Sequence, residues 1–376
     1  MRKLFSAIAC NLDTNILSAS LPLFIAEKVE AIEWSFDTLF DQDEIPAWFT
    51  ELLRTFSDEG RLIGHGVFFS LFSGKWSNEQ HEWLAQLKKL AAQFKFDHVT
   101  EHFGFMTGED FHKGAPIGIP FTSSTLAIGI DRLKRIHDAG NCPVGLENLA
   151  FAYSLEEVKK HGDFLSQLVE PVNGFIILDL HNVYCQVQNF EISFDEIIKF
   201  YPLDRVREIH ISGGSWEAVR SNPEKKIRRD THDESVPREV FELLKKSIPL
   251  CPNLKFIVLE QISSGLETEQ SRLLFQSDFN KMNEIVQSYQ PTPSPIYNLF
   301  IPAKPFNVVA IPLEDTVLHA QQQQLSSILE TAAGTEEALM LLTKSSLADS
   351  AWEIEKWNPM MLETAIAIAQ KWKNGF

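Results

Sequence analysis

The sequence predicts an α/β protein, a (β/α)8 barrel of the TIM type followed by a small α-helical C-terminal module. Three observations predict this fold. Eight short apolar runs recur between residues 8 and 261, amphipathic helical patterns separate most of them, and polar residues stand at several of their ends. Buried-looking strands alternating with helices indicate a parallel sheet covered by helices, and eight repeats allow that sheet to close.

The expected strands are apolar runs bounded by polar or turn residues. They span Ile8 to Asp13, Ala31 to Phe36, Leu62 to Ser70, His98 to Phe105, Val144 to Leu149, Phe175 to Val183, Arg207 to Ser212 and Phe256 to Gln261. Expected helices include Asn78 to Phe94, Ser124 to Ala139, Leu155 to Val169, Phe194 to Phe200, Pro237 to Lys246 and Glu269 to Gln287. Ser154 and Glu157 form a predicted capping box, and Asn78 is a predicted N-cap.

The chain divides into three expected parts. Residues 1–289 form the metal-binding barrel, residues 290–312 a Pro-rich linker, and residues 313–376 a helical module. Gly334 and Pro359 interrupt the helical pattern of that module.

Composition excludes several classes of protein. The formal net charge of −17 repels nucleic acid and argues against a DNA- or RNA-binding protein. No run approaches the about 18 apolar residues of a membrane span, and the apolar part of MRKLFSAIAC is too short for a signal peptide, so no membrane partner is expected. The four cysteines lack CxxC spacing, which indicates core thiols of a reducing compartment and a cytoplasmic protein.

Imidazoles and carboxylates gather at the expected C-terminal ends of the strands, from which a parallel barrel delivers side chains into one mouth. Burying carboxylates there is costly unless a cation compensates them. Six candidates stand at strand ends, and a loop adds Asp230 and His232. These eight groups exceed one tetrahedral zinc site and suffice for two or three ions bridged by carboxylates. The candidate ligands are His65, His102, Glu147, Asp179, His210, Asp230, His232 and Glu260.

Some of these residues have a second interpretation. A lone histidine such as His65 is often a hydrogen-bonded structural residue, and Glu147 could pair with an Arg or Lys. Alternation along one strand places Asp179 and His181 on the same face. Asn182 faces the mouth only if the strand ends at Leu180, and the pattern leaves this open.

Histidines outside the candidate set are expected to be structural or exposed. His98 lies near the start of its strand and is interpreted as a packing residue. His112, His137 and His161 fall in loop or helix surroundings and are expected to face solvent.

The ordered motifs resemble those of the DUF692 family, the multinuclear non-haem iron-dependent oxidative enzymes. The resemblance spans roughly residues 7–287 and rests on HGVFFSLFSG, TEHFGF, LENLA, LDLHNVY, EIHISGG, DTHDESVP and the closing LEQ. It implies a TIM barrel with two or three irons that modifies a ribosomally made peptide, commonly by oxidising cysteine with O2. A separate or fused partner would recognise the leader of that peptide.

Carried over by motif, the resemblance adds Asn182 to the eight candidate ligands. His181 here replaces the first Asn of the family's D-x-N-N motif. The first strand reads AIACNLD instead of a Gly-rich segment ending in Arg, and the usual E-R-D reads Glu260, Gln261, Ile262. Imidazoles and carboxylates suit iron, and zinc or manganese also fit them.

The leading hypothesis is therefore an iron-dependent oxidoreductase that modifies a peptide, with cysteine as the expected target. One alternative is a divalent-metal hydrolase or isomerase on a barrel like those of endonuclease IV and the sugar isomerases. Another is a non-catalytic binding protein that docks through its helical module. The sequence has no G-x-S-x-G elbow, P-loop or G-x-G-x-x-G motif, which argues against the enzyme classes that use them.

Overall fold

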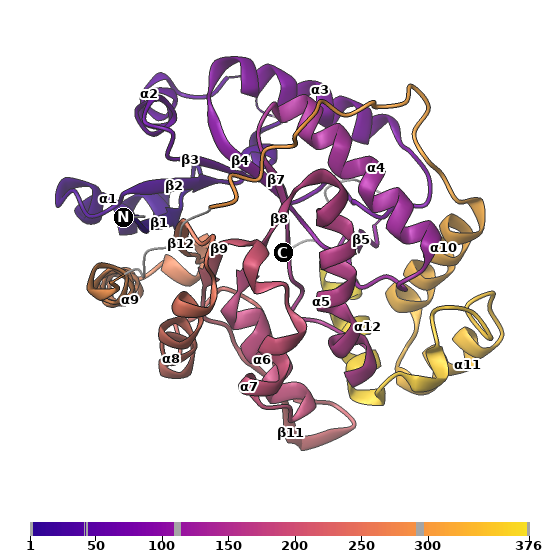
Figure 1. The fold of residues 1–376 in the computed structure, drawn as a ribbon. Coiled ribbons are helices and arrows are strands. Elements are labelled where there is room, and N and C mark those ends of the chain that lie inside the picture. Colours follow the sequence, from indigo (N-terminus) through magenta and orange to yellow (C-terminus); the bar gives the residue numbers. More distant parts are fainter. Residues whose placement is uncertain (1–2, 41, 43, 109–113, 291–296, 374–376) are drawn as a thin grey trace.

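The protein is built around a closed barrel of eight parallel strands, seen in the computed structural model (Figure 1). The structure describes residues 3–40, 42, 44–108, 114–290 and 297–373. Around the barrel, the strand order is β1 (Phe5–Ala9), β12 (Phe256–Leu259), β9 (Val206–Ile211), β8 (Phe175–Asp179), β7 (Val144–Glu147), β4 (Phe96–His102), β3 (Leu62–His65) and β2 (Ala31–Trp34). The predicted TIM barrel is confirmed.

Helices surround the barrel wall (Figure 1). They are α1 (Thr14–Ile25), α2 (Ala47–Asp58), α3 (Asn78–Gln93), α4 (Ser123–Gly140), α5 (Leu155–Val169), α6 (Leu180–Phe190), α7 (Phe194–Ile197), α8 (Arg238–Ser247) and α9 (Glu269–Ser288). Two antiparallel ribbons lie outside the barrel sheet, one formed by β5 (Phe105–Met106) with β6 (Pro116–Ile117) and one by β10 (Trp216–Val219) with β11 (Asn222–Arg228).

Side-chain caps explain where two of these helices begin. Ser77, not the predicted Asn78, caps α3 in a full capping box with Gln80, because its side chain precedes the first helical turn. Ser154 caps α5 as predicted, and its hydroxyl accepts from the Glu157 N–H (3.2 Å).

The predicted strand from Phe175 to Val183 is wrong in its second half. The strand ends at Asp179 and α6 begins at Leu180. The Asp179 carboxylate accepts from the Asn182 N–H, so Asp179 is at once the last strand residue and the N-cap of α6. A helical turn replaces the alternation of a strand, which changes the directions of His181 and Asn182.

A buried ion-pair network closes the end of the barrel opposite the mouth. The Asp97 carboxylate accepts from Arg207 Nη2 (2.6 Å), and it also contacts Lys255 and His98. Burial alone would raise the pKa of Asp97, but the hydrogen bond from His98 and the charge of Arg207 outweigh it and lower the pKa. His98 is thus a buried hydrogen-bonding residue and not only a packing residue.

Replacing Asp97 by asparagine is expected to reduce the free energy of unfolding by about 3 kcal/mol at pH 7, since the buried Arg207 loses its counter-charge. A lowered pKa stabilises the fold in full above the unfolded value of about 3.9, and this contribution is lost progressively as the pH falls from there towards the lower folded pKa. The difference between wild type and Asp97→Asn in urea unfolding should therefore shrink between pH 7 and pH 3. A difference that does not change with pH would contradict this account.

The C-terminal part contains α10 (Thr316–Thr331), α11 (Thr335–Thr343) and α12 (Pro359–Lys373). Residues 297–315, within the expected linker and just after it, have no regular structure but pack on α4, where Arg132 donates to Leu313 O (2.7 Å) and Arg135 to Val309 O (2.8 Å). Residues 291–296 of that linker lie outside the described residues. Glu363 of α12 accepts from the backbone N–H of Ser221 (3.2 Å), which ties α12 to the β10–β11 ribbon.

All four cysteines are buried, as the sequence predicts. Within the described ranges, no helix is both long and apolar enough to span a bilayer.

Candidate metal centre

A cavity of about 670 Å³ opens at the C-terminal ends of the barrel strands. Seven of the nine predicted ligands line it, namely His65, His102, Glu147, Asn182, Asp230, His232 and Glu260. The other two, Asp179 and His210, are fully buried next to this lining. Met361, Thr364 and Ile368 of α12 also line the cavity, so the C-terminal module forms part of its wall. The structure therefore brings all nine predicted residues to one place.

Four groups of imidazole and carboxylate ligand atoms among the described residues lie close enough together to hold one ion each. In each group, the potential ligand atoms are within 4.8 Å of one another. Three of them consist of predicted ligands, and we call these the ion groups: His65 with His102 and Glu147, Glu147 with Asp179 and His210, and Asp179 with His232 and Glu260. The fourth group joins His210 to Glu33 and Glu208. Glu147 and Asp179 each belong to two groups, so the three groups form one continuous chain joined by shared carboxylates.

The ligand atoms of these residues lack other partners. Eight of the nine predicted ligands have a buried nitrogen or oxygen without a hydrogen bond among the described residues: His65 Nε2, His102 Nδ1, Glu147 Oε2, Asp179 Oδ2, Asn182 Oδ1, His210 Nδ1, His232 Nε2 and Glu260 Oε2. Buried polar atoms are nearly always paired in folded proteins, so a concentration of unpaired atoms at one site needs an explanation. Bound cations would account for the unpaired atoms that face Glu147 and Asp179, and the donor set fits such ions.

The charges of the site also favour a bound cation. Among the described residues, Glu147, Asp230 and Glu260 form ion pairs only with histidines and with no Lys or Arg. Burial and the nearby charges of Asp230 and Glu147 raise the pKa of Asp179 well above its usual range. The alternative that Arg or Lys neutralises these carboxylates is therefore not supported.

The β8–α6 junction decides which side chain of the LDLHNV segment reaches the site. Asn182 Nδ2 donates to Glu147 Oε1 (3.1 Å) and to Asn148 O (2.7 Å), which leaves Oδ1 available to a cation. His181 turns away: its Nδ1 lies 3.0 Å from Asp230 Oδ1, and Arg228 Nε donates to its Nε2 (3.2 Å). Both ring nitrogens of His181 are occupied, so it positions Asp230 and does not belong to the ligand groups.

Asp230 and His232 come from the loop after β11. His232 adopts a positive φ of 53°. Its Nε2 lies 2.7 Å from Asp230 Oδ1, an ion-pair distance without the alignment of a hydrogen bond. Asp230 belongs to none of the candidate ion groups among the described residues, although it contacts both His181 and His232.

The glycine pair after β9 serves this loop. A Cβ on Gly213 would overlap the backbone oxygens of Glu234 and Ser235, and one on Gly214 would overlap that of Arg229. Without side chains, the two glycines let the loop carrying Asp230 and His232 pack against the barrel.

Two buried carboxylates behind His210 escaped the sequence reasoning. His210 Nε2 lies 2.9 Å from Glu208 Oε1 and 3.0 Å from Glu33 Oε2, while Glu208 also contacts His98. With Nε2 held in this way, Nδ1 is the atom that faces Glu260 (3.3 Å). Alternation along β9 could have revealed Glu208, because residues two apart share a strand face. Glu33 carried no comparable signal.

His65 is oriented by a hydroxyl group. Its Nδ1 lies 2.7 Å from Thr100 Oγ1, which donates to Gly64 O (3.3 Å). The hydroxyl therefore accepts from Nδ1–H, and Nε2 is presented to Glu147 at 3.3 Å. A purely structural role of His65 explains the hydrogen bond of Nδ1 but not the position of Nε2 next to Glu147.

The expectation that His161 faces solvent is wrong. It is buried, and its Nε2 accepts from the Leu149 N–H (3.3 Å), because α5 packs its inner face on the end of β7. His137 is partly buried against Phe306. His112 lies outside the described residues.

The curated proteins that resemble this chain carry names that state no function. A "UPF0276 protein" of Caulobacter vibrioides (strain NA1000 / CB15N) is 26% identical over 181 residues, which are 48% of this chain and 61% of that protein. One from Acaryochloris marina is 30% identical over 40% of this chain and 54% of that protein. One from Acinetobacter baylyi is 24% identical over 62% of this chain and 80% of that protein. The chain thus spans less than two thirds of the first two relatives.

Solved structures of similar shape are distant in sequence. Endonuclease IV from Thermus thermophilus is 14% identical, covers 74% of this chain and 99% of its own, and has a TM-score of 0.48. An IOLI protein with a bound zinc atom is 11% identical, covers 77% of this chain and 100% of its own, and has a TM-score of 0.47.

A family model gives the specific match. The model described as RiPP precursor modification enzyme MbnB/TglH/ChrH matches residues 37–270, more than half of the chain. The matched segment contains all nine predicted ligands and the three ion groups. The chain belongs to the MbnB/TglH/ChrH family of RiPP precursor modification enzymes.

Proposed function

We propose that the protein is an iron-dependent oxidoreductase that modifies a ribosomally made peptide, at cysteine and with O2. The observation that carries the proposal is the chain of three ion groups joined by Glu147 and Asp179 in a member of this family. The proposed ligands are His65, His102, Glu147, Asp179, Asn182, His210, Asp230, His232 and Glu260.

The donor set supports iron without excluding zinc or manganese. Imidazole nitrogens and carboxylate oxygens suit all three metals, whereas a thiolate-rich site would favour zinc or copper. No described cysteine belongs to an ion group. When bound, two or three iron ions would relay electrons from the peptide, which is oxidised, to O2, which is reduced.

The protein's own residues prepare the site in three ways. Glu33 and Glu208 hold the ring of His210, and Thr100 holds that of His65, so these imidazoles need no reorientation when a cation binds. Asn182 fixes Glu147 through its amide. Burial of the groups, with α12 along one wall of the cavity, limits the access of water.

Metal analysis tests the proposal. Protein purified without oxygen should contain two or three irons per chain and show an electron paramagnetic resonance signal after partial oxidation. Fewer than two irons with full zinc occupancy would contradict it. Phosphodiesterase activity of zinc-loaded protein would instead favour the hydrolase alternative.

The substrate can be tested separately. Co-expression with a short cysteine-containing peptide encoded beside the gene should change the mass of that peptide only when O2 is present. An unchanged peptide mass with fully iron-loaded enzyme would count against that peptide as the substrate. A partner protein for the leader would be required if the reaction occurs in cells but not with the two purified components.

A further inference from the structure

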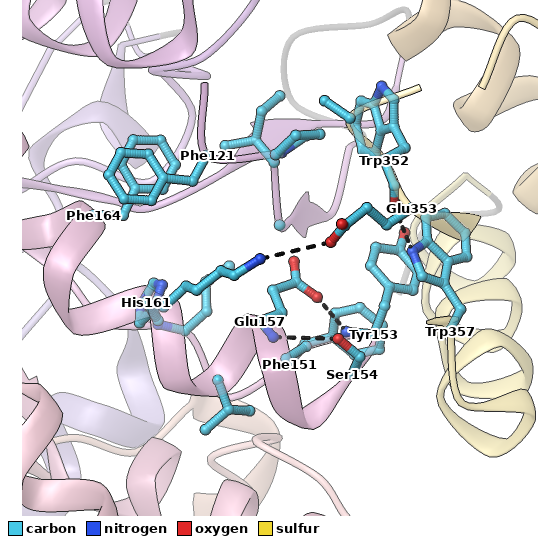
Figure 2. Close-up of a pocket in the computed structure, with 18 of the residues that line it drawn as sticks. Phe121, Phe151, Tyr153, Ser154, Glu157, His161, Phe164, Trp352, Glu353 and Trp357 are labelled. Carbon is cyan, nitrogen blue, oxygen red and sulfur yellow. Dashed lines mark hydrogen bonds and ion pairs between the residues drawn. The ribbon is translucent and has the colours of Figure 1, made fainter. Parts of the chain in front are cut away.

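A second cavity, of about 360 Å³, lies between α5 and the segment that precedes α12 (Figure 2). Its walls come from parts of the chain far apart in sequence: Phe121 before α4, Phe151 to His161 around the start of α5, and residues 350–357 of the C-terminal module. The ion groups do not include any residue of this lining.

Aromatic rings form most of the wall. The rings of Tyr153 and Trp357 stack at 3.7 Å, and Phe151 meets Tyr153 edge-on at 4.9 Å. On the opposite side, Phe121 stacks on Phe164 at 4.4 Å (Figure 2). Such a wall favours a ligand with an apolar stem, and the faces of the rings attract a cation.

A carboxylate without a cationic partner lies inside this wall. Glu157 Oε2 accepts from the Tyr153 N–H (2.6 Å), and Figure 2 shows the carboxylate pointing into the cavity. Within the described part of the chain, no Lys or Arg forms an ion pair with Glu157, because the nearby Lys160 pairs with Glu353 (3.7 Å). Burial raises the pKa of Glu157 to about 7, although hydrogen bonds from the Tyr153 and Ser154 backbone and the nearby charge of Lys160 act to lower it, so the charge of Glu157 is only partly compensated.

An unpaired hydroxyl provides a second, independent sign. Tyr153 is only 2% exposed, and its hydroxyl has no hydrogen-bond partner among the described residues. A ligand that donates hydrogen bonds and carries positive charge would satisfy both this hydroxyl and the Glu157 carboxylate. A neutral apolar ligand would leave the hydroxyl unpaired and the charge of the carboxylate uncompensated, and an anion would be repelled.

The cavity adjoins the candidate metal centre. Leu149 and Phe151 line both this cavity and the cavity at the barrel mouth, so the two cavities share a wall. A residue bound in this cavity therefore lies close to the barrel mouth. The ion pair of Lys160 and Glu353 stands at the rim, where the two side chains are 53% and 41% exposed.

We propose that this cavity, lined by Glu157, Tyr153 and their aromatic neighbours, binds the lysine or arginine side chain of a residue near the modification site of the substrate peptide. The peptide as occupant rests on the proposed function. The preference of the cavity for an organic cation depends on its own residues alone and requires no metal.

The first experiment uses metal-free, full-length protein, so that it stands whatever the metal centre does. The probes are Nα-acetyl-arginine methylamide and Nα-acetyl-lysine methylamide, with the citrulline and norleucine analogues as neutral matches. Binding is followed by the fluorescence of Trp352 and Trp357, which lie in the wall. We expect saturable binding of a cationic probe and at least tenfold weaker binding of its neutral match. Equal binding of both, or no binding of either cation, would overturn the proposal.

Three variants test which residues of the cavity bind the cationic probe. Glu157→Gln keeps an acceptor for the Tyr153 N–H but removes the charge, and should weaken cation binding at least tenfold. Tyr153→Phe removes only the hydroxyl and should weaken it several-fold. Glu156→Gln, on the exposed side of the same helix, is the matched control and should bind like wild type. Wild-type affinity in a folded Glu157→Gln protein would refute the assignment.

A second experiment addresses the peptide. Once a substrate is known, Glu157→Gln should raise KM at least tenfold with little change in kcat or iron content, and replacing the substrate's basic residue by norleucine should have the same effect. If the small cations bind but neither change alters KM, the occupant is not the substrate peptide. Absence of any turnover in wild type would instead refute the proposed function and leave the binding result intact.

Discussion

Replacing Glu147 by glutamine is expected to remove at least one metal ion per chain and to reduce the oxidation of the peptide at least a hundredfold. Glu147 belongs to two of the three ion groups, so the loss of its charge affects both. A neutral amide is a poor bridge between two cations, and the buried cations then lose one of the anions that compensate their charge. Metal content of the purified variant, measured with iron and zinc together, checks the first effect.

The control for this experiment is Asp233→Asn. Asp233 lines the same cavity but belongs to no ion group among the described residues, and it accepts from the Thr231 hydroxyl. It should keep the wild-type metal content. Circular dichroism separates the loss of metal from the loss of fold. A folded Glu147→Gln protein with the full number of ions would show that Glu147 is not a bridging ligand.

The second large effect is a loss of metal affinity on replacing Glu208, a buried residue that does not line the cavity at the mouth. Its Oε1 lies 2.9 Å from His210 Nε2, and its other oxygen contacts His98. Carboxylates that orient a metal-binding histidine typically contribute 10- to 100-fold to metal affinity. Glu208→Gln should therefore weaken binding of the ion at His210 by about this factor, because His210 loses the anion that holds its proton on Nε2.

Competition with a chelator measures this affinity, and a changed magnetic resonance signal of the iron would show that Glu208 acts through His210. A merely structural role would lower the melting temperature without changing the spectrum of the remaining ions. Glu242→Gln on the surface of α8 is the matched control. Unchanged affinity in a folded Glu208→Gln protein would mean that Glu33 alone is sufficient to orient His210.

The sequence by itself determined the barrel and located most of the candidate ligands. Strand and helix periods are local properties, so eight apolar runs could be counted before any contact was known. Parallel strands share one C-terminal edge, and for that reason His65, His102, Glu147, His210 and Glu260 could be expected in one mouth. Helix bounds also followed closely, as α5 from Leu155 to Val169 shows.

The tertiary structure decided what depends on a single boundary or on distant packing. The end of β8 at Asp179 turned Asn182 toward Glu147 and His181 toward Asp230, a choice that alternation could not make. Glu33 meets His210 only because the barrel closes. The aromatic cavity around Glu157 exists only because the C-terminal segment packs on α5. Such contacts join residues far apart in the chain, and their free energy comes from packing that no local pattern records.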